Sequence, residues 1–179
     1  IPADFDWSLL PGVGDSKKVS EKNRERIYKA ALGLAKAGKL SCTVEMASAK
    51  AIDKRGIAVV IRECIDKGLK ELSSRQDLEL DWGKVMVKLD GSLKAPAYCV
   101  HQETIIKGDA KEKVIGLASI LAKVTRDAYM RQLAEKPLYA PYQFAKHKGY
   151  GTALHRRTIT QSGLSPEHRV SYCKNIKVC

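Results

Sequence analysis

The chain has 179 residues, of which 44% are hydrophobic and 29% are charged. This composition is typical of a folded globular protein that is long enough to bury a core, and it excludes a disordered chain. Lys and Arg number 32 against 20 Asp and Glu, which gives a formal net charge of +12. Such an excess indicates a polyanionic partner, because each phosphate that a cation neutralises releases condensed counterions, but ribosomal and other basic proteins share it.

The cysteines and the apolar runs restrict the setting of the protein. The five cysteines are scattered and form no CxxC pair, so we expect neither a disulfide framework nor a zinc site, and a reducing cytosol is the simpler setting. No apolar run approaches the roughly 18 residues that span a bilayer, and the first residues lack the pattern of a signal peptide. We expect a single cytoplasmic domain over residues 1–179 that makes no membrane contact.

The hydrophobic pattern predicts alternating helices and strands. The stretch 1–18 is rich in Pro and Gly and is predicted to form a loop. In chain order there follow a helix over 21–37, a strand over 41–47, a helix over 54–72, strands over 84–89 and 98–106, a helix over 110–135, a loop over 139–151, and a helix that Thr152 caps and Gly163 ends. This alternation predicts an α/β domain with at least partly parallel strands.

Asp127 lies on a helix face that otherwise belongs to the core. Helical steps back from Asp127 reach Val124, Ile120 and Gly116, and the stretch around them is small and apolar. A buried carboxylate is costly unless it is paired or coordinates a metal ion. A metal-binding or catalytic role is therefore one interpretation of Asp127, and an ordinary ion pair with Lys123 is the other.

Asp90 follows the strand predicted over 84–89 and precedes Gly91. An Asp-Gly pair is a strong signal for a hairpin turn, but no second strand follows at once, which weakens that interpretation. In open α/β sheets ligands bind at the carboxyl ends of strands, and Asp90 falls at such an end. Asp90 is therefore a candidate ligand for a metal ion.

Asp90 and Asp127 together suggest a magnesium-dependent reaction. Mg²⁺ prefers hard oxygen ligands, usually one or two carboxylates together with water and substrate phosphate. Two such ions can activate a water molecule and stabilise the leaving oxygen of a phosphodiester. The expectation depends on both side chains converging on one site.

A first basic segment precedes the helix predicted over 21–37. Gly14-Asp15-Ser16-Lys17-Lys18 combines small backbone, a hydroxyl group and two cations near a helix N-terminus, which could contact phosphate. It is not a P-loop, because the Gly-Lys-Ser/Thr order is absent. From spacing alone, a solvated loop with a helix cap is the favoured interpretation.

A second basic segment is a stronger indication. In Lys146-His147-Lys148-Gly149-Tyr150-Gly151-Thr152 the glycines favour an exposed turn, where the Tyr150 ring can stack on a base or sugar. Lys146, His147 and Lys148 could hold phosphates beside it. A tyrosine packed beneath a loop is an equally good interpretation. Further along, His168-Arg169 could add phosphate contacts or simply lie at the surface.

Six segments, in order, resemble the ribonuclease HII family over nearly the whole chain. They are Asp15-Ser16-Lys17-Lys18-Val19-Ser20, Leu89-Asp90-Gly91, Ile106-Lys107-Gly108-Asp109, the run from Ala118 to Asp127, His147-Lys148-Gly149-Tyr150-Gly151-Thr152, and His168-Arg169-Val170-Ser171-Tyr172. Each is modest evidence alone. Their order and approximate spacing together are highly specific.

The resemblance implies a ribonuclease H-like fold, with a mixed sheet flanked by helices, and a monomer that hydrolyses RNA within RNA–DNA hybrids, including single ribonucleotides in duplex DNA. It implies that Asp90 binds the catalytic metal, Mg²⁺ or Mn²⁺, and that Asp127 is the fourth carboxylate of the site. It also implies that Tyr150 stacks at the ribonucleotide–deoxyribonucleotide junction. The residues that it places near the substrate backbone are Ser16, Lys17 and Lys18.

The sequence departs from the family at one point. The family begins with a strand carrying Asp-Glu-x-Gly-Arg-Gly, whose acids complete the metal site and whose Gly-Arg-Gly contacts the 2′-hydroxyl group. That motif does not occur in the 179 residues. We expect a domain without this strand, either trimmed from a longer protein, which we favour, or truncated. We expect the 179 residues alone to cleave little.

The leading hypothesis is hydrolysis on the 5′ side of a ribonucleotide by metal-activated water, which leaves a 3′-hydroxyl and a 5′-phosphate, as ribonucleotide excision requires. One alternative is a non-catalytic nucleic-acid-binding module of the same fold. Another is a different ribonuclease H-like nuclease, such as a resolvase or transposase core, which would cut DNA without any ribonucleotide.

Overall fold

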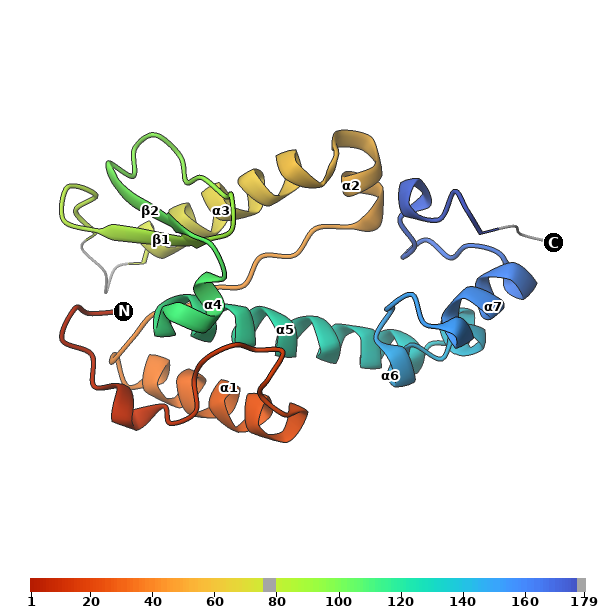
Figure 1. Cartoon of the computed structure of the whole chain (residues 1–179), viewed down its shortest axis with the longest axis horizontal. Coiled ribbons are helices and arrows are strands. Elements are labelled where there is room, and N and C mark those ends of the chain that lie inside the picture. The colour runs from red at the N-terminus through yellow and green to blue at the C-terminus, as the bar shows by residue number, and fades with distance from the viewer. Residues whose placement is uncertain (76–79, 177–179) are drawn as a thin grey trace. The chain divides into compact units, whose positions relative to one another are not determined.

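The computed structural model describes residues 1–75 and 80–176 (Figure 1). It contains helices and a two-stranded sheet, so the chain is α/β as predicted. It divides into two compact units, residues 1–45 with 61–124 and residues 46–60 with 125–179, and each is described by itself. None of the helices in the described ranges is both long and apolar enough to cross a membrane. The expected single domain stays a prediction.

The first unit holds most of the regular structure. Its elements are η1 (Trp7–Leu9), α1 (Glu21–Lys36), most of α3 (Ile57–Ser73), β1 (Met86–Asp90), β2 (His101–Ile105), α4 (Gly108–Lys111) and the first part of α5 (Lys113–Ala134). The predicted cap of α1 is present, because Ser20 Oγ accepts a hydrogen bond from the Asn23 amide at 3.3 Å. Gly38, with φ of 68°, follows the C-cap residue Ala37, so the helix ends close to the predicted position.

The core of the first unit lies between α1 and the first part of α5, which run side by side in Figure 1. Ile27 and Ala31 of α1 pack in one cluster with Leu117 and Ile120 of α5. Ile27, Ala31 and Ile120 are 0% exposed. The small, apolar face of α5 that the sequence indicated is therefore buried.

The sheet consists of β1 and β2, which pair in parallel with Asp90 opposite Ile105. Both strands fall within a few residues of the ranges predicted from alternation. Because the pair is parallel, the Asp90-Gly91 turn does not form a hairpin between them. Gly91 instead donates its amide hydrogen to Ile105 O at 3.0 Å, which places Asp90 at the carboxyl end of its strand, as predicted.

The prediction of a strand over 41–47 is wrong, because this stretch does not pair with a strand in the structure. Its side chains follow the alternating pattern only in part: Cys42 and Val44 lie against the core cluster and Glu45 forms a 2.7 Å ion pair with Lys67 of α3, but Met46, on the same predicted face as Cys42 and Val44, is 46% exposed. Alternation reports which side is buried, but a strand also needs a neighbouring strand for its backbone hydrogen bonds.

The helix predicted over 54–72 is interrupted. Gly56 adopts φ of 81° and ends α2 (Ala49–Arg55), after which α3 begins at Ile57. This positive φ is accessible to glycine at little cost, so the chain turns there. The helix predicted over 110–135 is likewise divided, with Glu112 in an extended conformation between α4 and α5.

The second unit contains mostly short elements. They are α2, the last part of α5, η2 (Pro137–Tyr142), α6 (Phe144–His147), α7 (Ala153–Ser162) and η3 (Val170–Tyr172). Thr152 caps α7 by accepting the His155 amide hydrogen at 3.2 Å, and Gly163 ends the helix, as predicted. The core of this unit is aromatic and includes Tyr142 and Phe144.

Candidate functional site

Asp90 is held by the backbone that follows the sheet. Its Oδ1 atom accepts a hydrogen bond from the Gly108 amide, the first residue of α4, at 2.7 Å. A Cβ atom at Gly108 would lie 2.6 Å from Ile115 Cδ1 and 3.4 Å from Asp90 Oδ1. A side chain at position 108 would therefore force the buried Ile115 side chain to move and would crowd the Asp90 carboxylate.

The carboxylate of Asp90 also has an oxygen that suits a metal ion. No hydrogen bond to Oδ2 is formed within residues 1–75 and 80–176. Among those residues there is no group of three or more His, Cys, Asp and Glu side chains that could hold a metal ion. A carboxylate oxygen is the kind of donor that Mg²⁺ or Mn²⁺ prefers, and water and substrate phosphate oxygens ordinarily complete a set that begins with one or two carboxylates.

Asp127 is buried, as its position on α5 predicted. Its residue is 4% exposed, and Val124 and Ile120, one and two turns earlier, are 8% and 0% exposed. Arg126 Nη1 lies 4.0 Å from Asp127 Oδ1. Asp127 belongs to the second unit and Asp90 to the first, so their expected convergence stays a prediction.

The segment around Ser16 packs on α5. The Ser16 hydroxyl lies 2.8 Å from the hydroxyl of Ser119, and Ser16 is 7% exposed. The amides of Lys17 and Lys18 donate to Asp15, at 3.0 Å in both cases, so the turn uses its own backbone donors. The ammonium groups of Lys17 and Lys18 are the parts of this segment that remain at the surface for a phosphate.

Gly116 allows this close packing on α5. A Cβ atom at Gly116 would come within 2.9 Å of the carbonyl oxygens of both Gly14 and Asp109. These are backbone atoms, which cannot swing aside as a side chain can. The helix therefore holds the loop before α1 through a glycine contact as well as through Ser119.

Tyr150 is exposed on a turn, as the flanking glycines predicted. It is 53% exposed, and the guanidinium carbon of Arg126 lies 5.5 Å from the centre of its ring. The same guanidinium group donates to the carbonyl oxygen of Lys148 at 2.7 Å. An exposed aromatic ring with a cation beside it is suited to stacking on a base or sugar.

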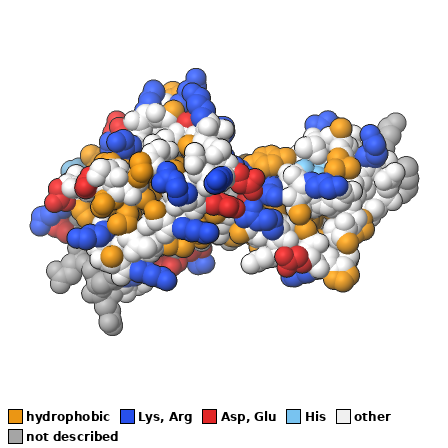
Figure 2. All heavy atoms as spheres, turned by 90° about the horizontal axis from the view of Figure 1, so that it is seen from below, with side chains coloured by type: hydrophobic (Ala, Val, Ile, Leu, Met, Phe, Trp, Pro, Cys, Tyr) orange, Lys and Arg blue, Asp and Glu red, His pale blue; other side chains and the backbone are white. Residues whose placement is uncertain are grey.

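The two lysines of the same segment lie at or near the surface. Lys146 Nζ donates to Gln143 Oε1 at 2.7 Å, and Lys148 Nζ donates to the Ala145 carbonyl oxygen. Both contacts are with neutral groups, which do not neutralise the charge of either lysine. Figure 2 shows Lys and Arg side chains spread widely over the face that it presents.

His147 is inside the protein and not at the surface where a phosphate could reach it. It is 7% exposed, its Nε2 atom lies 2.6 Å from the Tyr142 carbonyl oxygen, and its Nδ1 atom accepts the Gly149 amide hydrogen at 3.2 Å. Both ring nitrogens are therefore used within the loop. The geometry favours a supporting role for His147 over direct contact with a phosphate.

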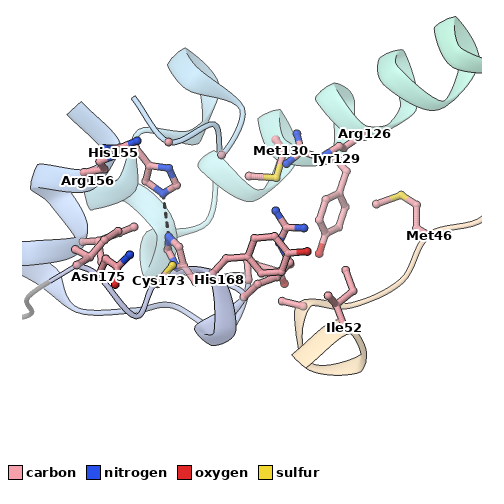
Figure 3. A pocket seen from close by; sticks show the side chains of 18 residues that line it. Met46, Ile52, Arg126, Tyr129, Met130, His155, Arg156, His168, Cys173 and Asn175 are labelled. Carbon is pink, nitrogen blue, oxygen red and sulfur yellow. Dashed lines mark hydrogen bonds between the residues drawn. The ribbon is translucent and has the colours of Figure 1, made fainter. Parts of the chain in front are cut away.

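His155 and His168 are also buried: the sequence indicated no role for His155, and the surface position that it suggested for His168 is wrong. A hydrogen bond, the dashed line in Figure 3, joins their Nε2 atoms. The two atoms are 2.9 Å apart, and the residues are 4% and 8% exposed. Burial lowers the pKa of His155, and burial together with His155 lowers the pKa of His168 to about 4. One available signal was that His155 follows the Thr152 cap on the same helix face as Ile159.

A cavity of about 580 Å³ lies in the second unit beside these histidines. Its lining includes the backbone on both sides of Tyr150, at Gly149 and Gly151, and three arginines, Arg126, Arg156 and Arg169. Figure 3 shows the His155–His168 pair among its lining residues and Met46, Tyr129 and Ile52 grouped apart from that pair. A lining with cations and aromatic rings suits an anionic ligand.

The similarity to known proteins identifies the family. The family model described as Ribonuclease HII matches residues 7–175. The chain is 36% identical over 172 residues to "Ribonuclease HII" of Endomicrobium trichonymphae, a match that covers 96% of this chain and 74% of that protein. The chain belongs to the ribonuclease HII family. It is also 39% and 38% identical to proteins of that name from Bacillus anthracis and Bacillus cereus strain AH820, and it spans 60% of their length.

The match to the ribonuclease HII family confirms the predicted resemblance, and the mixed α/β architecture agrees with the ribonuclease H-like fold that it implied. The family is one of endoribonucleases. Its model covers every candidate residue singled out above, from Ser16 to His168.

Proposed function

We propose that this protein is an endonuclease that hydrolyses the RNA strand of RNA–DNA hybrids and cuts on the 5′ side of ribonucleotides embedded in duplex DNA. The match to the ribonuclease HII family over residues 7–175 carries the proposal. The net charge of +12 and the exposed ring of Tyr150 beside Arg126 support a nucleic-acid substrate.

In this proposal Asp90 and Asp127 provide carboxylate oxygens to Mg²⁺ or Mn²⁺. The divalent ion supplies activation of a water molecule and stabilisation of the charge on the leaving oxygen. The Gly108 amide keeps the Asp90 carboxylate in one orientation by its bond to Oδ1. Water adds to the phosphorus atom and the bond to the upstream 3′ oxygen breaks, which leaves a 3′-hydroxyl and a 5′-phosphate.

The substrate is bound by charge and by stacking. Lys17 and Lys18 in the first unit, and Lys146 and Lys148 in the second, contact backbone phosphates, while Tyr150 stacks at the junction between ribonucleotide and deoxyribonucleotide. Ser16 and His147 support these segments from within. The scattered cysteines and the family resemblance further suggest a cytoplasmic monomer.

The test uses the full-length protein and three duplexes of one sequence: an RNA–DNA hybrid, DNA with a single ribonucleotide, and DNA alone. We expect Mg²⁺- or Mn²⁺-dependent cleavage of the first two, and loss of at least about 100-fold in kcat for Asp90→Asn and Asp127→Asn with binding retained. Cleavage of the all-DNA duplex would indicate a different ribonuclease H-like nuclease. Binding without cleavage of any duplex would indicate a non-catalytic module.

A second test concerns the Asp-Glu-x-Gly-Arg-Gly motif, which the 179 residues do not contain. If that motif supplies two further carboxylates, a polypeptide of these 179 residues should cleave a single-ribonucleotide duplex little, even with ample Mg²⁺ or Mn²⁺. Robust cleavage by this polypeptide would contradict the proposed division of the metal ligands.

A further inference from the structure

The three buried histidines of the second unit, His147, His155 and His168, surround the turn that carries Tyr150 and are linked to one another by hydrogen bonding and ring stacking. His168 bonds to His155, and His155 Nδ1 lies 2.9 Å from the Tyr150 carbonyl oxygen. His147 stacks on His155, with ring centres 4.2 Å apart and planes inclined by 19°. His147 in turn accepts the Gly149 amide hydrogen.

The neighbouring atoms fix where each ring carries its proton. The Ser165 amide can only donate, and it lies 2.9 Å from His168 Nδ1, so His168 is protonated at Nε2. His155 Nε2 must then accept from His168, which places the proton of His155 on Nδ1, facing the Tyr150 carbonyl oxygen. By the same reasoning His147 carries its proton on Nε2 and donates it to the Tyr142 carbonyl oxygen.

All six ring nitrogens thus have a partner of the opposite kind while the rings are neutral. A second proton on any ring would convert its acceptor nitrogen into a donor, which would then face the N–H group that donates to it now. The lowered pKa values of His155 and His168 agree with this arrangement.

We propose that His147 and His155 are positioning residues for Tyr150, because their rings hold the backbone at Gly149 and at Tyr150 itself, and that His168 selects the tautomer of His155 that does so. This inference rests on the proposed role of Tyr150 in binding substrate. It assigns the histidines no contact with the nucleic acid.

A histidine that only fills space would behave differently from one that holds the Tyr150 carbonyl group. Asparagine at position 155 places an amide near the Nδ1 position and can still donate to Tyr150 O, whereas glutamine reaches the Nε2 position and keeps only the bond to His168. Asparagine is the smaller of the two, so packing alone predicts that it is the more damaging.

The kinetic test compares His155→Asn with His155→Gln in the full-length protein on a duplex with one ribonucleotide. We expect His155→Gln to raise KM about tenfold with little change in kcat, and His155→Asn to raise it less than about threefold, since base–aromatic stacking accounts for a factor of this order. The control is His101→Gln, which changes the exposed fourth histidine on β2 and should leave KM unchanged. Equal effects of the two variants at position 155, or no effect of either, would overturn the inference.

A second measurement separates this inference from the proposed function. Long-range ¹H–¹⁵N spectra of histidine-labelled protein at neutral pH should show His147 and His168 protonated at Nε2 and His155 at Nδ1. A different tautomer of His155 would overturn the inference whatever the activity. If the tautomers are as stated but Tyr150→Ala leaves KM unchanged, the proposed role of Tyr150 fails, and the functional meaning of the set fails with it.

Discussion

The turn that carries Tyr150 and the strand end that carries Asp90 differ in how they are held. On both sides of the Tyr150 ring the backbone is bonded to buried imidazoles that lie within about 20 residues of it along the chain. Within the described residues the Asp90 carboxylate accepts one hydrogen bond, from Gly108, and Asp90 ends a strand whose neighbour, β2, is almost wholly exposed. The first region is built from buried contacts, and the second lies beside an exposed strand.

This difference has an energetic meaning. A two-stranded sheet is marginally stable by itself, so β1 and β2 need packing from other elements to keep Asp90 in place. The Tyr150 turn instead has its polar groups satisfied inside one aromatic cluster. We therefore expect the two regions to respond to different perturbations.

The largest expected effect is that of Phe144→Ala. Phe144 is 1% exposed, stacks on Tyr142 at 5.4 Å between ring centres and makes T-shaped contacts with the rings of His147 and His155. Its removal should lower the free energy of unfolding by about 3–5 kcal/mol in denaturant titrations. Leu138→Ala, at a residue that is 64% exposed, is the control and should change it by less than about 0.5 kcal/mol. A similar loss in both would show that the aromatic cluster is not the main support.

A fall in pH should weaken the Tyr150 region next most strongly. The unfolded chain protonates its histidines below about pH 6.5, whereas the pKa of folded His168 is about 4, because burial disfavours the imidazolium ion. Stability that is fully present above pH 6.5 is therefore lost as the pH falls toward 4, by at most about 1.4 kcal/mol per unit for this group. Urea unfolding at pH 7, 6 and 5 measures the slope. His168→Gln should have a shallower slope, and an unchanged one would contradict the assignment.

Gly108→Ala tests the support of Asp90. The new Cβ atom would lie 2.6 Å from Ile115 Cδ1, and we expect a loss of about 1–3 kcal/mol in unfolding free energy. Because the amide that holds Asp90 would shift, kcat should fall more than KM rises. Gly33→Ala in α1 is the control: nothing lies within 4 Å of its Cβ position, so it should stabilise the helix by up to about 1 kcal/mol. An unchanged kcat for Gly108→Ala would show that the Gly108 bond is dispensable.

The smallest effect should come from Glu112→Gln, beside the sheet. The ion pair between Lys88 and Glu112 is 2.8 Å long but partly exposed, and its hydrogen bond raises the pKa of Lys88. Exposed pairs contribute little, so the denaturation midpoint should barely move while the pKa of Lys88 falls toward its ordinary value. An NMR titration of the Lys88 side chain follows that pKa. A large fall in the midpoint would mean that β1 depends on this pair.

The sequence predicted well the features that depend on neighbouring residues. Ser20 and Thr152 located the beginnings of α1 and α7, and the helical period placed Asp127 on the buried face of α5. The strand at 41–47 failed because alternation does not identify a pairing partner. Gly56 was passed over because a single glycine inside an apolar helical pattern is often tolerated.

The arrangement of the histidines could not be predicted in the same way. His147 and His155 form hydrogen bonds with main-chain atoms, the carbonyl oxygens of Tyr142 and Tyr150. Every residue has a carbonyl oxygen, so the sequence does not indicate which one a histidine contacts. Whether Asp90 and Asp127 meet is a matter of long-range geometry and stays a prediction. The family motifs identified these residues, whereas periodicity and spacing alone left each with an ordinary alternative.

Arg126 stands next to Asp127 in α5 and reaches both the Lys148 carbonyl oxygen and the Tyr150 ring. Tyr150, proposed to stack at the junction, contacts Arg126, and the carboxylate proposed to hold the metal belongs to the next residue, Asp127. A bend or a slip of α5 at this turn would displace both at once. Mispositioned substrate and impaired cleavage would then appear together as a single defect, and kinetics alone would not separate them.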